Sequence, residues 1–148
     1  MKEKYLNEIN KNLIEFTSLF HSKISKAFRK KVDGEYKCNK NQNRAIMIIG
    51  NHNSISPSTL GKYLDMRKGS LTTLVDSLAK KNLVKREVDK NDRRRYLLSL
   101  TYEGIEYMEH EKEIFKNVIK ELFEKLDEKE IESFSENMNN VNETMKKV

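Results

Sequence analysis

The sequence lacks several features that define whole classes of protein. It contains one cysteine, Cys38, so no disulfide can form within the chain. It has no apolar run of about 18 residues, the length that suggests a membrane-spanning helix. Residues 1–4 lack the apolar segment of a secretory signal peptide. We therefore expect a cytoplasmic protein that is not inserted in a membrane.

Motifs of the common enzyme classes are also missing. The sequence has no glycine-rich phosphate-binding loop, no HExxH zinc motif and no nucleophile elbow. His21, His52 and His110 are scattered and show no paired spacing, whereas zinc sites use clustered His, Cys and carboxylate ligands. We expect a protein that is not an enzyme and that needs no metal or cofactor.

Positive charge is concentrated in the first two-thirds of the chain. The formal net charge is +6 over 148 residues. Residues 1–61 and residues 62–100 each carry 11 Lys and Arg against 5 Asp and Glu, whereas residues 101–148 carry 7 against 13. A polyanion is therefore attracted to the first two segments and repelled by the third. The alternative is the solvated surface of Lys-rich helices, and charge alone does not decide between these interpretations.

Apolar residues at three- and four-residue steps predict a mainly helical chain. The single proline, Pro57, follows Ser56, a pair that is typical of the start of a helix. A capping-box pattern at Asp127 predicts another helix start. The predicted helices cover residues 5–31, 40–51, 57–64, 69–81, a long stretch from 101 and the residues after 127, with Ile55 extended and strands at 83–88 and 96–100.

Residues 60–101 combine a helix, a turn, a second helix and a hairpin whose tip, residues 89–95, is basic. Two helices joined by a short turn fit the major groove of DNA. Arginines on a narrow hairpin tip suit the minor groove, where the negative potential is concentrated. The two probes at this spacing predict a protein that binds double-stranded DNA.

The start of the helix at residues 69–81 carries candidate base-reading side chains. When its leucines face inward, Lys68, Ser70, Thr72 and Thr73 face outward. Lysine suits phosphates, and Ser and Thr hydroxyls bond either base edges or phosphates. The alternative is that Ser70 caps the helix and that the threonines are ordinary surface residues.

Residues 60–86, 92–94 and 98–104 resemble the helix-turn-helix, the wing and the next helix start of the MarR family of bacterial transcriptional regulators. The resemblance implies a mainly α fold with a small β-wing, the winged helix-turn-helix. Arg67 departs from the family pattern, because a Ser or similar cap is common there. Asn82 stands where Gly is common, and Asn tolerates the same left-handed backbone.

The resemblance also implies roles in the wing. Arg94 is the residue inserted into the minor groove, and Asp92 supports it. Arg93 and Arg95 then meet phosphates or an acidic surface. A carboxylate two positions before Arg94 can hold the guanidinium extended without neutralising the whole tip. The alternative, that these arginines serve only solubility, does not account for the position of Asp92.

We expect a single domain over residues 1–148, with residues 1–33 and 101–148 as dimerisation helices and residues 40–100 as the DNA-binding lobe. The terminal apolar stripes are long for so small a core, which favours a homodimer over a monomer with folded-back termini. The expected function is a repressor of a pseudo-palindromic operator. A non-specific architectural DNA-binding protein and a protein-interaction module are the alternatives.

Family resemblance further implies that a small, often aromatic effector relieves repression. The cleft for such a ligand lies between the first helices and the DNA-binding lobe. The side chains assigned to it are Phe16, Phe20, His21, Met47 and Tyr63. The alternative is that these residues belong to the core.

A redox role of Cys38 is a further alternative. Family members that sense oxidants use a cysteine near the start of the first helix, and Cys38 lies instead before the second predicted helix. A buried thiol is usually inert. The neighbouring Lys37 and Lys40 could lower the pKa of this thiol, which is the basis for the redox alternative.

Overall fold

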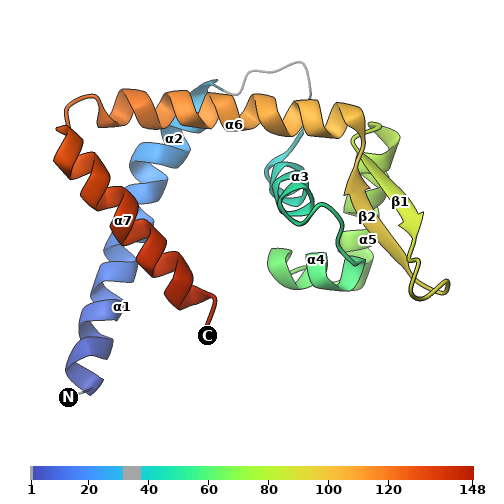
Figure 1. Ribbon diagram of the computed structural model, residues 1–148, viewed down its shortest axis with the longest axis horizontal. Coiled ribbons are helices and arrows are strands. Elements are labelled where there is room, and N and C mark those ends of the chain that lie inside the picture. The colour runs from blue at the N-terminus through green and yellow to red at the C-terminus, as the bar shows by residue number, and fades with distance from the viewer. Residues whose placement is uncertain (1, 32–37) are drawn as a thin grey trace. The chain divides into compact units, whose positions relative to one another are not determined.

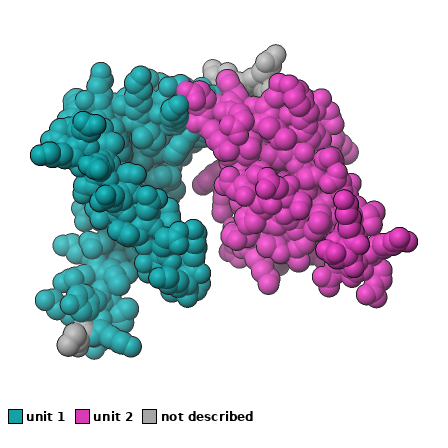
Figure 2. All heavy atoms as spheres, in the orientation of Figure 1, with its two compact units in different colours: residues 1–33, 114–148 teal, residues 34–113 magenta. Residues whose placement is uncertain are grey.

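The computed structural model describes residues 2–31 and 38–148, and these form two compact units (Figure 1, Figure 2). Unit 1 contains the described residues 2–31 and 114–148, and unit 2 contains residues 38–113. The division falls inside helix α6 (Tyr102–Phe123), after Glu113, and not at residue 101. In the described part of the chain, no helix has the length and apolar character needed to cross a bilayer.

The first helical run of unit 1 is α-helical at both ends and contains a π-helical segment between them. Helix α1 (Lys2–Leu19) continues into the π-helical segment η1 (Phe20–Ser25) and then into α2 (Lys26–Lys31). This run confirms the helix predicted over residues 5–31, but the sequence pattern did not reveal its π-helical turn, a feature that is frequent at functional sites. Asp33 and Gly34 are a sequence signal for a turn after this run, and they lie outside the described residues.

Aromatic contacts pack the helices of unit 1. The ring of Phe28 in α2 meets Phe115 of α6 edge-on, with centroids 5.4 Å apart. Phe123 and Phe134 make a similar contact at 5.0 Å, which joins α6 to α7 (Glu128–Met145). The predicted capping box at Asp127 is confirmed, because its side chain accepts from the Glu130 amide at 2.9 Å and its own amide donates to the Glu130 carboxylate.

Two of three successive helices in unit 2 begin with a side-chain cap, and one of these caps, at Ser56, was predicted from the sequence. Helix α3 (Lys40–His52) is capped by Asn39, and α4 (Pro57–Leu64) is capped by Ser56, which accepts from the Thr59 amide at 3.2 Å. Helix α5 (Lys68–Lys80) follows Arg67, whose side chain makes no capping hydrogen bond. Arg67, which replaces the Ser or similar residue common in the family pattern, therefore leaves the start of α5 without a side-chain cap.

An antiparallel hairpin follows α5. Strand β1 (Val84–Val88) pairs with β2 (Tyr96–Leu100), in a register that sets Val84 opposite Leu100. Asn82 adopts the expected left-handed conformation, with φ 57°. Ile55 is extended, as predicted, and exchanges two backbone hydrogen bonds with Leu98.

The core of unit 2 lies between the hairpin and helices α3, α4 and α5. Its fully buried large side chains are Ile46, Ile49, Leu60, Leu78, Leu83 and Leu98. Helix α6 begins against this core, where Thr101 caps it by accepting from the Gly104 amide at 2.9 Å. This packing fixes the hairpin base and α5 to one scaffold.

Candidate nucleic-acid interface

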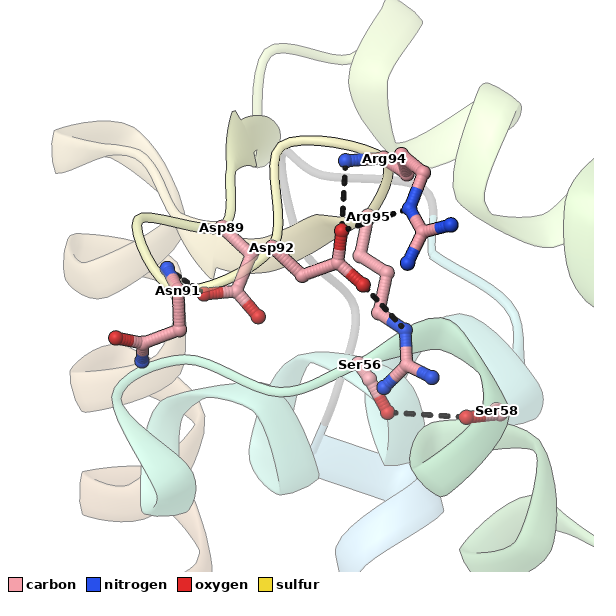
Figure 3. Close-up of polar contacts among 7 residues, drawn as sticks. All are labelled: Ser56, Ser58, Asp89, Asn91, Asp92, Arg94 and Arg95. Carbon is pink, nitrogen blue, oxygen red and sulfur yellow. Dashed lines mark hydrogen bonds and ion pairs between the residues drawn. The ribbon is translucent and has the colours of Figure 1, made fainter.

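The hairpin tip is organised by the carboxylate of Asp92. Its Oδ1 accepts from the backbone amide of Arg94 at 3.1 Å and from Nε of the same residue at 3.3 Å. Its Oδ2 lies 3.5 Å from Nε of Arg95 (Figure 3). The backbone and side-chain hydrogen bonds from Arg94 lower the pKa of Asp92, so the carboxylate is ionised at neutral pH.

The rest of the tip is held by short-range hydrogen bonds. Asp89 accepts from the Asn91 amide through its side chain at 2.9 Å, and its own amide donates to the Arg95 carbonyl at 3.0 Å. The side chain of Arg94 is 92% exposed despite its contact with Asp92. The tip therefore presents an exposed guanidinium on an ordered turn, and Arg93 beside it is also exposed.

Helix α5 presents the side chains that the sequence pattern placed on its outer face. Lys68, Ser70, Thr72 and Thr73 are all exposed. Ser70 does not cap the helix, because the N-cap position belongs to residue 67. The leucines predicted to face inward, Leu71, Leu74 and Leu78, are buried, and Val75 is buried with them.

The two threonine hydroxyls of this face already donate within the helix. Thr72 donates to the Lys68 carbonyl at 2.9 Å, and Thr73 donates to the Gly69 carbonyl at 3.2 Å. Both hydroxyl oxygens keep lone pairs as acceptors, and both methyl groups remain available for apolar contact with thymine. Their contact with bases stays a prediction.

A basic hollow lies between α4, α5 and the hairpin residues 94–96. Four cations line it, Lys62, Lys68, Arg94 and Arg95, together with one carboxylate, Asp65. Sequence reasoning did not find this hollow. Its walls come from helices α4 and α5, the turn between them and the hairpin, which meet only in the folded chain.

Arg86 of β1 is a second feature that sequence reasoning missed. Its guanidinium pairs with Asp76 of α5 and lies 5.7 Å from the ring centroid of Tyr96 in β2. The hydrogen bond with Asp76 raises the pKa of Arg86. The sequence analysis gave neither residue a role, because the pair forms between a helix and a strand.

The residues assigned to a ligand cleft lie in both units. In unit 1, the Phe20 ring lies 6.1 Å from that of Phe16 and 5.9 Å from that of His21. In unit 2, Met47 packs against the core, and the exposed Tyr63 lies 5.1 Å from the His52 ring. A ligand role for these five residues stays a prediction.

The pKa of the Cys38 thiol is raised, whereas its lysine neighbours in the sequence suggested that it could be lowered. Burial raises the pKa of its thiol, and the opposing effects of a hydrogen bond with Tyr107 and of the charge on Lys81 are smaller. This direction is opposite to the lowered pKa on which the redox alternative rested. Lys37 lies outside the described residues.

Comparison with known proteins gives a consistent family match. Residues 38–96 match the model of the MarR family. The chain is 34% identical over 82 residues to the HTH-type transcriptional regulator SarZ of Staphylococcus haemolyticus, a match that covers 55% of this chain and 53% of that protein. The chain spans about half the length, or less, of the curated relatives that it matches. Both are named as regulatory proteins of transcription and not as enzymes.

Solved structures confirm the predicted winged helix-turn-helix fold. A MarR family protein from Bacillus stearothermophilus superposes with a TM-score of 0.77 at 18% identity, covering 99% of both chains. Streptococcus pneumoniae FabT, in complex with DNA, superposes with a TM-score of 0.70 at 22% identity, covering 96% of this chain and 98% of that one.

Proposed function

We propose that this chain, which carries a MarR-family domain over residues 38–96, is a sequence-specific DNA-binding regulator of transcription. The observation that carries the proposal is the wing tip, where the guanidinium of Arg94 is bound by Asp92 and yet the side chain remains 92% exposed. A guanidinium held in this way can enter a minor groove without first being ordered. The exposed face of α5 on the same scaffold supplies the major-groove contacts.

We further propose that the protein acts as a homodimer. Unit 1 leaves many large apolar side chains exposed, and their burial against a second copy would stabilise both chains. These side chains are Tyr5, Leu6, Ile9, Leu13 and Ile14 of α1, and Ile131, Phe134, Val141 and Met145 of α7. A two-fold dimer then requires a pseudo-palindromic operator whose half-site centres lie about 34–36 Å apart.

Sedimentation equilibrium tests the dimer. Leu13→Glu places a charge on the exposed apolar face of α1, and we expect it to raise the dissociation constant of the dimer by at least about tenfold, because an unpaired charge would be buried. Asn12→Glu is the matched control, since the neighbouring exposed residue is already polar. A monomeric wild-type chain at micromolar concentration would contradict this part of the proposal.

The proposed regulatory action is repression relieved by a small aromatic effector. A ligand that binds better to the conformation with weaker DNA affinity shifts the population towards it by its differential affinity. The aromatic pairs around Phe20 and Tyr63 offer surfaces for such a ligand. Retention of operator binding in the presence of a compound library of aromatic acids and phenols would argue against this regulation.

Selection of random DNA duplexes by the purified protein tests sequence-specific binding. We expect an enriched inverted repeat, and we expect Arg94→Ala to weaken binding to it by about 10- to 100-fold, in line with the loss of a well-placed base contact. Arg93→Ala removes the same charge from the same tip and is expected to cost less. Salt-sensitive binding without enrichment would favour the architectural alternative, and no binding with or without Arg94 would favour an interaction module.

A further inference from the structure

Adjacent grooves of DNA are separated by a sugar–phosphate strand. A protein that places one probe in the major groove and another in the neighbouring minor groove must therefore leave room for that strand between the probes. In this chain the space between α5 and the wing is the basic hollow, at the foot of the hairpin tip. The inference that follows rests on the proposed DNA-binding function.

The chemistry of the hollow suits an anion. Lys62, Lys68 and Arg95 line it from three different elements, and the side chains of all three are exposed. Among the described residues, neither lysine takes part in an ion pair. Asp65 is the opposing carboxylate on the wall, so the cations outnumber it. A phosphodiester carries one negative charge, which the cations that line the hollow can neutralise.

The two carboxylate oxygens of Asp92 contact the side chains of two neighbouring arginines, Arg94 and Arg95. Its Oδ1 binds Arg94, and its Oδ2 faces Nε of Arg95. Figure 3 shows the side chain of Arg95 extending towards Ser56 and Ser58, at the start of α4. Because the contact with Asp92 uses only Nε, the terminal nitrogens of Arg95 keep their N–H groups for another acceptor.

The hydroxyl groups of the hollow differ in what they can donate. Thr72 already donates to the Lys68 carbonyl. The hydroxyl oxygens of Ser58 and Ser56 lie 3.1 Å apart, and the Ser56 hydroxyl can donate its hydrogen to Ser58 in this contact. Ser58 can then donate its own hydrogen to a phosphate oxygen.

We propose that the basic hollow seats one phosphodiester of the DNA backbone, held by Arg95, Lys62, Lys68 and the hydroxyl of Ser58. This phosphate belongs to the strand that passes between the recognition helix and the wing. Arg95 therefore contributes affinity without sequence information, whereas its neighbour Arg94 contributes the groove contact. One carboxylate, that of Asp92, orients both.

The salt dependence of DNA binding tests whether Arg95 contacts a phosphate while Arg94 contacts the groove. A lost phosphate contact reduces the slope of log K against log salt concentration by about 1. We expect this reduction for Arg95→Gln, with about tenfold weaker binding at 0.1 M salt and an unchanged sequence preference. Lys80→Gln is the matched control, because it removes one exposed charge from the far end of α5 and does not line the hollow. Its slope should stay that of the wild type.

Neutral phosphate substitution locates the contact. Each operator phosphate is replaced in turn by a methylphosphonate, and one position between the grooves should weaken wild-type binding but weaken Arg95→Gln no further. An unchanged slope, or full sensitivity of Arg95→Gln at every position, would overturn the phosphate seat. A reduced slope on DNA without an enriched operator would support the seat and overturn sequence-specific regulation. Failure of the wild type to bind any duplex would overturn both.

Discussion

Arg86 of β1 forms an ion pair with Asp76 of α5 and thereby ties the hairpin to this helix. The guanidinium also lies over the ring of Tyr96, so the contact spans a helix and both strands. Both charged side chains are partly exposed to solvent. Such pairs contribute little to global stability, typically less than about 1 kcal/mol. We expect the contribution of this pair to be the relative orientation of the two DNA probes.

Variants of Arg86 and Asp76 can show whether the pair orients the hairpin against α5 or stabilises the fold. We predict that Arg86→Gln lowers the free energy of unfolding by less than about 1 kcal/mol but weakens operator binding by about tenfold, an effect of about 1.4 kcal/mol, because the wing is no longer held against α5. The double variant Asp76→Arg, Arg86→Asp should recover part of the lost affinity. Fluorescence anisotropy and thermal melting measure the two effects. Equal losses in the single and the exchanged variants would show that the pair does not orient the wing.

Gly104 marks the closest backbone approach in unit 2. A Cβ atom at this position would lie 2.0 Å from the carbonyl oxygen of Leu83, a backbone atom that cannot rotate away. We predict that Gly104→Ala lowers the free energy of unfolding by about 2–3 kcal/mol, as overpacking does. Gly69→Ala is the matched control, because nothing lies within 4 Å of its Cβ, and it should be neutral or stabilising by up to about 1 kcal/mol. Urea denaturation of both variants checks the pair of outcomes, and a neutral Gly104→Ala would contradict the close approach.

Glu111 predicts a pH dependence of stability. Its side chain is buried, and burial raises the pKa of the carboxyl group, which the charge of His110 opposes less strongly. The folded chain therefore holds the proton more tightly than the unfolded chain does, and stability falls as pH rises from the ordinary carboxyl range through the raised pKa. Glu111→Gln keeps an acceptor for the Asn43 amide, which lies 3.4 Å from the carboxylate.

We predict that Glu111→Gln raises the free energy of unfolding at pH 7 by about 1 kcal/mol and has little effect at pH 4. The reason is that the amide is neutral at both pH values, whereas the carboxylate becomes charged only at the higher one. Urea denaturation at the two pH values measures the difference. A variant that is destabilised more at pH 7 than at pH 4 would indicate that the charged carboxylate stabilises the fold.

Cys38 is predicted to react slowly with alkylating agents. Because burial raises the pKa of its thiol, the nucleophilic thiolate is scarce at neutral pH. We expect iodoacetamide to modify the folded chain several-fold more slowly at pH 7 than the urea-unfolded chain, as followed by intact mass. Faster reaction of the folded chain would revive the redox alternative.

Local interactions account for the parts of the fold that the sequence predicts well. Ser56 and Pro57 start α4 by contacts within one helical turn, and the capping box at Asp127 starts α7 in the same way. The support of Arg94 by Asp92 is also local, because the two residues are separated by a single position. Such interactions depend on residues near in sequence, so their spacing is visible before folding.

Interactions between distant segments could not be predicted in the same way. The basic hollow joins Ser58 to Arg95, and the tie on the wing joins Asp76 to Arg86. Burial raises the pKa of the Cys38 thiol, whereas its flanking lysines in the sequence had suggested that the pKa could be lowered. The sequence by itself determined most of the helices, the caps at Ser56 and Asp127, the exposed face of α5 and the hairpin with its basic tip, since these depend on periodicity and on short-range hydrogen bonds. Only the tertiary structure decided what lies between the probes and which side chains lose water, because both depend on surfaces that come together when the core forms.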